Sequence, residues 1–391
     1  MESNYQDGLA GSGGADPASP GRTASSSVDI DELVSKVVRL EASDLHLKVG
    51  LPPAVRVNGL LGPLEGYGAL RPEDTEGILK RILPRKLAAE FDQEGEADFS
   101  YEVSGLGRFR VNAFRQRGSV SVALRYIPLG VPAFDELGLP EVIKSFAFEE
   151  RGIILLTGTT GSGKSTTLAS MIDLVNRSMA KHVVTIEDPI EYLHRDDKSI
   201  INQREVGTDT ASYSRALRRV LRQDPDIILI GEIRDTESAQ IALSAAETGH
   251  LVLSTLHTLD ATETVNRLID LFPEQEQNQV RIMLAGTLKG IVGQRLVRTT
   301  DGKRTPACEV MVSTGRIRDF ITDPAQTAMI QQAIYEGEYY GMQTFDQALL
   351  KHVEEGRIDF EEALRQASRP QDFKLMVQAL GLTARAARGG G

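Results

Sequence analysis

The stretch GTTGSGKST, residues 158–166, decides the fold of this chain. It fits the pattern G-x-x-x-x-G-K-[ST] in full, and it directly follows the apolar run IILLT. The glycines allow backbone N–H groups to wrap around phosphate oxygens, and the helix expected after them directs its positive N-terminal end at the same oxygens. The stretch therefore predicts a phosphate-binding loop between a strand and a helix.

Within this loop, Lys164 is expected to contact the β- and γ-phosphates of a nucleotide, and the Ser165 hydroxyl is expected to ligate Mg²⁺. The predicted nucleotide-binding residues are those of the whole loop: Gly158, Thr159, Thr160, Gly161, Ser162, Gly163, Lys164, Ser165 and Thr166.

Three further segments are short and mostly apolar, like the run before the loop. They are HVVTIE, DIILIG and HLVLST, and each is followed by a turn and a helical stretch. Short apolar strands that alternate with helices are typical of a parallel sheet with both faces covered. We therefore predict an α/β fold in which ligands bind at the carboxyl ends of the strands.

The run DIILIG ends without the aspartate that a P-loop enzyme normally provides for magnesium. Gly231 stands in that place, and the first carboxylate is Glu232. An acid at this edge can orient and deprotonate the water that attacks the γ-phosphate. The alternative is a solvated loop acid, but the position just past a buried strand favours a catalytic role.

The stretch TIEDPIEY, residues 185–192, groups Glu187, Asp188 and Glu191 after another strand. Charged runs are usually only solvated, but a cluster at a strand end can supply the metal-side carboxylate that Gly231 does not. Glu191 is the preferred member and the second candidate ligand of Mg²⁺.

Two histidines flank the last of these strands, in GHLVLSTLHT at residues 249–258. His250 and His257 are seven residues apart on extended chain, so they point to opposite faces and are not expected to share a metal ion. One can contact the γ-phosphate while the other is structural, and spacing alone does not choose between them.

Arginines form two further groups of candidates. Arg218 and Arg222 are four residues apart on one face of a predicted helix, just before the strand that ends at Glu232. The first part of the chain places further arginines on and around a predicted strand pair, namely Arg108, Arg110, Arg115 and Arg125. Arginine is the residue that completes a phosphoryl-transfer site from a neighbouring subunit. The alternative is that these are ordinary surface arginines.

The remaining pattern divides the chain into segments. A helical stripe near residue 30, a helix across residues 72–91 and several alternating strands indicate a small α+β domain before the nucleotide-binding part. The predicted segments are a disordered tail (1–27), this domain (28–127), a linker (128–150), the α/β core (151–300), a mostly helical part (301–381) and a frayed tail (382–391).

Composition narrows the class of protein. The 391 residues carry a net charge of −11, which argues against broad electrostatic capture of nucleic acid. Cys308 is the only cysteine, so intrachain disulfides and multi-cysteine zinc sites are excluded. We find neither an apolar stretch of the roughly 20 residues that a membrane-spanning helix needs nor a secretory signal. We therefore expect a cytoplasmic protein.

Taken in order, four boxes make the chain similar to the type II/type IV secretion ATPase family, over about residues 28–380. GTTGSGKST resembles the family's Walker A box and TIEDPIEY its aspartate box, while ILIGEIRD and GHLVLSTLHT resemble its atypical Walker B and histidine boxes. The resemblance implies a RecA-like P-loop NTPase core with a parallel sheet. A small α+β PAS-like domain would precede this core, and a helical C-terminal region would follow it.

The resemblance also implies roles for the candidate residues. Glu232 would be the catalytic base, assisted by Glu191 and His257. The nucleotide, ATP with Mg²⁺, would lie between domains and subunits of a hexameric ring. The arginines that reach it would be Arg110 and Arg125 of the first domain and Arg218 and Arg222 of the core.

Within this family the resemblance is greatest to the ATPases of type IV pilus retraction. It implies a mechanochemical ATPase that powers pilin disassembly and twitching motility through an inner-membrane pilus platform protein. Such a motor would lie at the inner face of the cell membrane, with other pilus ATPases as further partners.

Relatives that drive pilus assembly or type II secretion usually carry a four-cysteine zinc module, which one cysteine cannot form. A motor that drives pilus assembly or type II secretion remains the alternative function. A nucleic-acid translocase is more remote, since no nucleic-acid partner is expected, and a nucleotide switch with negligible turnover is the third possibility.

Overall fold

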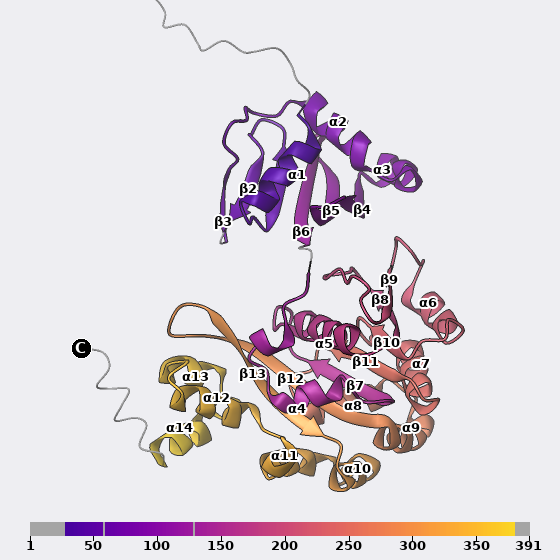
Figure 1. Ribbon diagram of the computed structural model, residues 1–391, viewed down its shortest axis with the longest axis vertical. Helices are drawn as coiled ribbons and strands as arrows, with labels where there is room; N and C mark the ends of the chain where they lie inside the picture. Colours follow the sequence, from indigo (N-terminus) through magenta and orange to yellow (C-terminus); the bar gives the residue numbers. More distant parts are fainter. Residues whose placement is uncertain (1–27, 58, 128–129, 380–391) are drawn as a thin grey trace, which may run out of the picture.

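The computed structural model describes residues 28–57, 59–127 and 130–379 of the chain. Figure 1 shows a small N-terminal domain above a larger α/β domain, with the last helices of the chain along one side of the larger domain. The predicted tails, residues 1–27 and 382–391, lie outside the described residues.

The N-terminal domain is built on an antiparallel sheet with the order β3-β2-β1-β6-β5-β4. Its strands are β1 (Asp44–Lys48), β2 (Ala54–Val57), β3 (Leu60–Pro63), β4 (Glu96–Val103), β5 (Gly107–Gln116) and β6 (Ser119–Ile127). Helix α1 (Ile30–Arg39) is capped at its N-terminus by Asp29, whose carboxylate accepts a hydrogen bond from the amide of Asp31. The apolar stripe of α1 is buried, as its spacing predicts.

One predicted helix of this domain is wrong. Residues 72–91 do not form a single helix but two, α2 (Pro72–Ile82) and α3 (Ala88–Glu94), with the short 3₁₀ turn η1 (Arg85–Leu87) between them. Pro84 causes the break, because it lacks an N–H group and disfavours helical backbone in the residue before it.

The larger domain contains a seven-stranded sheet with the order β13-β12-β7-β11-β10-β8-β9. All neighbouring strands are parallel except β13, which is antiparallel to β12. The strands are β7 (Gly152–Thr157), β8 (His182–Glu187), β9 (Ile200–Glu205), β10 (Ile227–Ile230), β11 (Leu251–Leu256), β12 (Leu288–Arg298) and β13 (Arg304–Val312). Every residue of β7, β10 and β11 is buried, which confirms the predicted parallel sheet with both faces covered.

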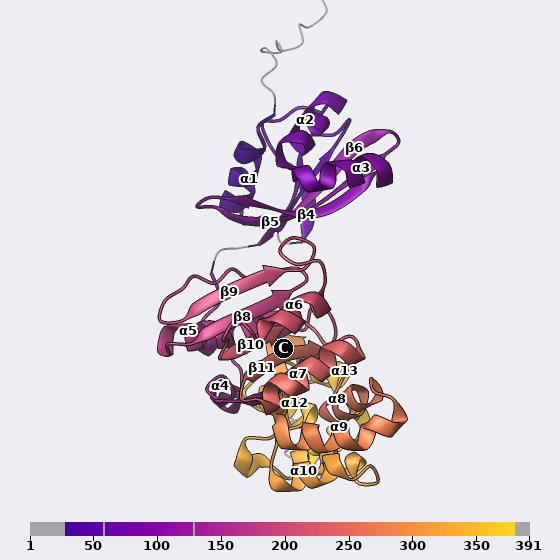
Figure 2. The ribbon, with the colours of Figure 1, turned by 90° about the vertical axis from the view of Figure 1, so that its right-hand side faces the viewer.

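Helices pack on both faces of this sheet (Figures 1 and 2). One face is covered by α4 (Glu141–Phe146) and α5 (Lys164–Ser178). The other face is covered by α6 (Tyr213–Val220), α7 (Thr236–Glu247), α8 (Ala261–Asp270), α9 (Glu274–Thr287), α10 (Gly315–Thr322) and α11 (Ile330–Tyr335).

The chain between and after the predicted domains differs from the expectation in two respects. Residues 128–150, predicted as a linker, contain the 3₁₀ turn η2 (Phe134–Glu136) and α4, and both bury side chains in the core of the larger domain. The core also does not end at residue 300, because β13 extends its sheet to Val312. The predicted helical C-terminal region follows, with α12 (Phe345–Glu354), α13 (Phe360–Gln366) and α14 (Pro370–Ala379), which share a separate hydrophobic cluster with Val297 of β12 and Ala307 of β13.

Candidate active site

The phosphate-binding loop joins β7 to α5, as the motif predicts. Gly158 and Gly163 have positive φ angles of 137° and 91°. A Cβ atom added at Gly158 would lie 2.4 Å from the backbone oxygen of Gln294. A Cβ atom added at Gly163 would lie 2.7 Å from the side-chain nitrogen of Gln294. The close approach of β12 therefore requires glycine at both positions.

The lysine of the loop is folded against its backbone. The Lys164 ammonium donates hydrogen bonds to the carbonyl oxygens of Gly158 (2.7 Å) and Thr159 (3.1 Å). Burial lowers the pKa of Lys164, and the nearby Glu191 carboxylate opposes this shift. A buried cation beside the backbone of this loop, at the N-terminus of α5, is suited to contact with phosphate oxygens.

The carboxylate of Glu232 lies just past the end of β10, and only 13 % of its side chain is exposed. One carboxylate oxygen is 2.8 Å from Nε2 of His257, which follows β11. The other oxygen accepts a hydrogen bond from the guanidinium of Arg234, which also lies 3.7 Å from Asp188. The structure therefore brings Glu232 and His257 together and adds Arg234, a residue within the boxes that sequence reasoning did not single out.

Gly231 has no room for a side chain. A Cβ atom there would lie 2.7 Å from the Tyr213 hydroxyl and 3.2 Å from the carbonyl oxygen of Ile186. Tyr213 is the first residue of α6, and burial raises its pKa. The position where other P-loop enzymes carry an aspartate is therefore closed by a tyrosine from the neighbouring helix.

The aspartate-box loop after β8 is held by polar contacts from β9. Gln203 donates one hydrogen bond to the carbonyl oxygen of Tyr192 (2.8 Å) and one to Glu187 (3.2 Å). Burial raises the pKa of Glu187, which also accepts a hydrogen bond from the Thr185 hydroxyl at 2.6 Å. The Tyr192 hydroxyl contacts Thr166 of the phosphate-binding loop (2.9 Å), whereas the Glu191 side chain is exposed.

These elements surround a cleft of about 640 Å³ at the carboxyl ends of the strands. Its lining includes Thr160, Gly161, Gly163, Lys164, Ser165 and Thr166 of the loop, together with Asp188, Glu191, Tyr213, Glu232, Arg234, His257 and Arg304. Arg110 of β5 also lines the cleft, so the N-terminal domain contributes to it.

The other predicted arginines do not line this cleft. Arg125 is paired with Asp44 at 2.9 Å, and Arg218 is paired with Glu237 at 2.5 Å. Arg222 does not share a helical face with Arg218, because α6 ends at Val220. The prediction for that pair is wrong in this respect. The sequence DPD at residues 224–226 favours a turn, so the end of the helix close to Arg222 could have been predicted from the sequence.

The two histidines lie at opposite ends of β11, and Nδ1 of His250 contacts the carbonyl oxygen of Ala245 at 3.0 Å. Over residues 28–379, where the structure describes them, no group of three or more His, Cys, Asp and Glu side chains is arranged to hold a metal ion. Mg²⁺ is commonly bound through one or two protein oxygens together with substrate phosphates. The Ser165 hydroxyl and the Glu191 carboxylate at the cleft fit that mode.

The profile of the family described as "Type II/IV secretion system protein" matches residues 108–378. The chain is 44 % identical to the type IV pilus retraction ATPase PilT of Pseudomonas aeruginosa, over 88 % of this chain and 100 % of that protein. It is 40 % identical to the type IV pilus ATPase PilU of the same organism, over 90 % and 92 % of the two chains.

Among solved structures, the chain is similar to the pilus retraction motor PilT with bound ADP. The TM-score is 0.82 at 45 % identity, covering 88 % of this chain and 98 % of that one. Sequence, fold and the cleft with its phosphate-binding loop agree, and this chain belongs to the Type II/IV secretion system protein family.

Proposed function

We propose that this protein hydrolyses ATP to ADP and phosphate and uses the energy to power type IV pilus retraction. The observation that carries the proposal is the Glu232–His257 pair, which lines the same cleft as Lys164 and Ser165. The similarity to a retraction ATPase over nearly the whole chain supports the choice of process.

The residues of the cleft suit a phosphoryl transfer to water. Lys164 and the backbone amides of the loop hold the β- and γ-phosphates, and Glu232 accepts the proton of the attacking water. Each oxygen of Glu232 already accepts one hydrogen bond and keeps a further lone pair that can accept from the attacking water. His257 can turn toward the γ-phosphate, since its side chain is more than half exposed.

Magnesium would be held by Ser165, with Glu191 as the second protein ligand, and when bound it would neutralise charge on the phosphates. The chain's own contribution is to fix the hydroxyl of Ser165 at the start of α5, directly after Lys164.

The arginines support assembly into a ring. Arg110 reaches the cleft within one chain, whereas Arg125, Arg218 and Arg222 do not line it. Exposed arginines of this kind can complete the site of a neighbouring copy. We therefore propose a homohexamer in which nucleotide lies between subunits.

The proposed partners are an inner-membrane pilus platform protein and other pilus ATPases, with the ring at the cytoplasmic face of the membrane. Among the described residues, no helix has the length and apolar character needed to cross a membrane. A motor for pilus assembly or secretion uses the same chemistry and is the alternative.

The test compares the parent protein with Lys164→Ala in steady-state phosphate release and in complementation of a retraction-deficient strain. We expect hydrolysis and restored twitching from the parent and neither from the variant. Hydrolysis with restored piliation of an assembly-deficient strain, but no twitching, would favour the alternative motor. Hydrolysis that requires added DNA would favour a translocase. Binding without turnover would favour a nucleotide switch.

A further inference from the structure

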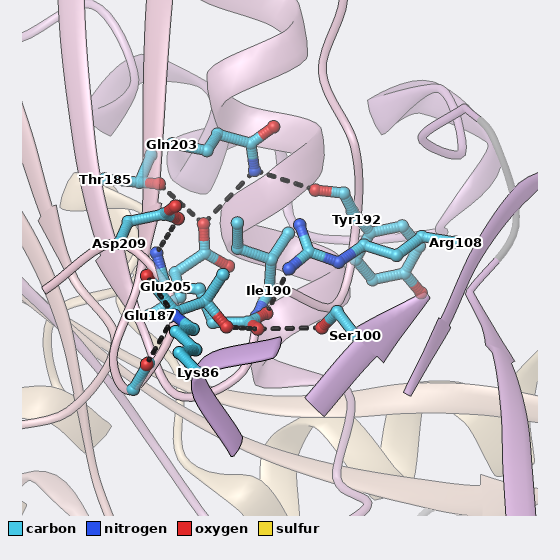
Figure 3. Close-up of polar contacts among 12 residues, drawn as sticks. Lys86, Ser100, Arg108, Thr185, Glu187, Ile190, Tyr192, Gln203, Glu205 and Asp209 are labelled. Atoms are coloured by element: carbon cyan, nitrogen blue, oxygen red, sulfur yellow. Dashed lines mark hydrogen bonds and ion pairs between the residues drawn. The ribbon is translucent and has the colours of Figure 1, made fainter. Parts of the chain in front are cut away.

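Glu205, the last residue of β9, lies between the two domains (Figure 3). Its side chain is 5 % exposed, and its carboxylate accepts hydrogen bonds from both domains. One oxygen accepts from the hydroxyls of Ser100 (2.7 Å) and Thr208 (3.0 Å). The other oxygen forms an ion pair with the guanidinium of Arg108 (2.8 Å) and accepts a hydrogen bond from the backbone amide of Ile190 (3.1 Å).

On the side of the N-terminal domain, these contacts lie next to Arg110. Arg108 and Arg110 are two residues apart on β5, so both project from the same face of the strand. Ser100 of β4 is the register partner of Arg110. The two groups that bind Glu205 therefore come from the part of the sheet that presents Arg110 to the nucleotide cleft.

On the side of the larger domain, the contact lies next to Glu191. The amide of Ile190 is fixed by Glu205, and Glu191 is the following residue and lines the cleft. The backbone after Glu205 is tied to the same domain boundary, because the Lys86 ammonium donates to the carbonyl oxygen of Thr208 at 2.9 Å.

We propose that Glu205 is a positioning residue for ATP hydrolysis, which holds Arg110 of the N-terminal domain and Glu191 of the aspartate-box loop in one arrangement at the nucleotide. The inference rests on the proposed function. Burial distinguishes this contact from a surface ion pair: the side chain of Arg108 is 10 % exposed, and removing one partner of a buried pair leaves the other uncompensated. Displacements of about 1 Å in a positioned group can lower a rate by about 10²-fold.

The experiment uses Glu205→Gln, which keeps the size of the side chain but removes the ion pair with Arg108, and Glu205→Ala, which also removes the bond to Ile190. The matched control is Glu362→Gln. Glu362 is a 7 % exposed carboxylate that pairs with Arg365 at 2.6 Å and accepts from a backbone amide, but it lies among the C-terminal helices. Each variant is combined with Arg110→Ala, and kcat and KM for ATP are measured.

We expect Glu205→Ala to lower kcat by about 10- to 100-fold, with a smaller change in KM, and Glu205→Gln to have an intermediate effect. The control should change neither constant. Because Glu205 is proposed to act partly through Arg110, the Glu205→Ala/Arg110→Ala double variant should lose less than the product of the two single losses. Losses that multiply, or an equal loss in the control, would overturn the proposal.

A second readout does not depend on turnover. Hydrogen exchange at the amide of Ile190, measured without nucleotide, should accelerate in Glu205→Ala and stay at the parent rate in Glu362→Gln. Unchanged exchange in Glu205→Ala would contradict the assigned contact. A parent protein that binds but does not hydrolyse ATP would instead refute the proposed function and leave the exchange result standing, so the two failures can be told apart.

Discussion

If Glu232 is the general base, as we propose, its replacement by Gln should abolish hydrolysis while leaving nucleotide binding intact. The carboxylate accepts hydrogen bonds from His257 on one oxygen and from Arg234 on the other. Arginine has only donors, so the amide oxygen of the new side chain must face Arg234 and its NH₂ group must face His257. His257 can accept there in its neutral form, which is favoured because burial together with the nearby Lys164 and Arg234 lowers its pKa.

The substitution is therefore expected to preserve the fold and the affinity for nucleotide. Lys164 and Ser165 remain in place to bind phosphates and metal, so ATP affinity should stay within a few-fold of the parent. The amide cannot accept a proton, and loss of a general base costs about 10²- to 10⁴-fold in rate. At 1.36 kcal/mol per factor of ten, this corresponds to about 3 to 5 kcal/mol in the activation barrier.

The assay pairs the affinity for a fluorescent ATP analogue with the single-turnover rate of phosphate release. Glu191→Gln should lower the rate less, because that residue is proposed to assist. Glu247→Gln, an exposed acid at the last position of α7, should behave like the parent. If Glu232→Gln hydrolyses ATP near the parent rate while Glu191→Gln does not, the base lies in the aspartate-box loop and the assignment to Glu232 fails.

Two further predictions concern the surroundings of this base, and a third concerns Glu309, a buried acid of β13. Gly231→Ala should lower both the melting temperature and the ATPase rate, because its Cβ atom would lie 2.7 Å from the Tyr213 hydroxyl, and adding Tyr213→Phe should restore part of both; no restoration would refute the steric reason. The kcat of the parent should fall as pH drops below the ordinary range of histidine, because protonated His257 holds Glu232 as an ion pair; His257→Gln should lack this dependence in a pH–rate profile. Burial raises the pKa of Glu309 from 4.5 to about 7, so the folded protein binds this proton more tightly than the unfolded chain and loses stability as pH rises through that range. Glu309→Gln should therefore raise the melting temperature more at pH 8 than at pH 5. The corresponding difference in the free energy of unfolding is on the order of 3 kcal/mol at most.

The central strands were predictable because their environment leaves little choice of residue. β7, β10 and β11 are buried on both faces, so their sequences GIILLT, IILI and LVLSTL are mostly apolar. The edge of the sheet was not predictable in the same way. β9 carries the polar sequence INQRE, because Gln203 and Glu205 hold the loop after β8 instead of packing in the core.

The residues of the candidate site that belong to a local sequence motif could be predicted from the sequence. Lys164, Glu232 and His257 follow strands of one parallel sheet, so the fold alone brings them to one edge. Contacts between distant segments have no such local signal. The pairing of Glu205 with Arg108 depends on how the N-terminal domain lies against the larger one, and neither residue has an unusual neighbourhood in the sequence.

Gly231 shows how such a distant contact shapes the chemistry. A local reading of DIILIGE finds an aspartate missing, but the structure shows that a side chain there would meet Tyr213 on one side and the backbone of β8 on the other. The carboxylate is therefore displaced to the next residue, where the longer Glu232 side chain reaches His257. A side chain at position 231 would require the Tyr213 hydroxyl to move. We propose that the protein side of magnesium binding falls to Ser165 and the aspartate-box loop. The position of that loop, which Glu205 contacts through the Ile190 amide, would then bear on hydrolysis.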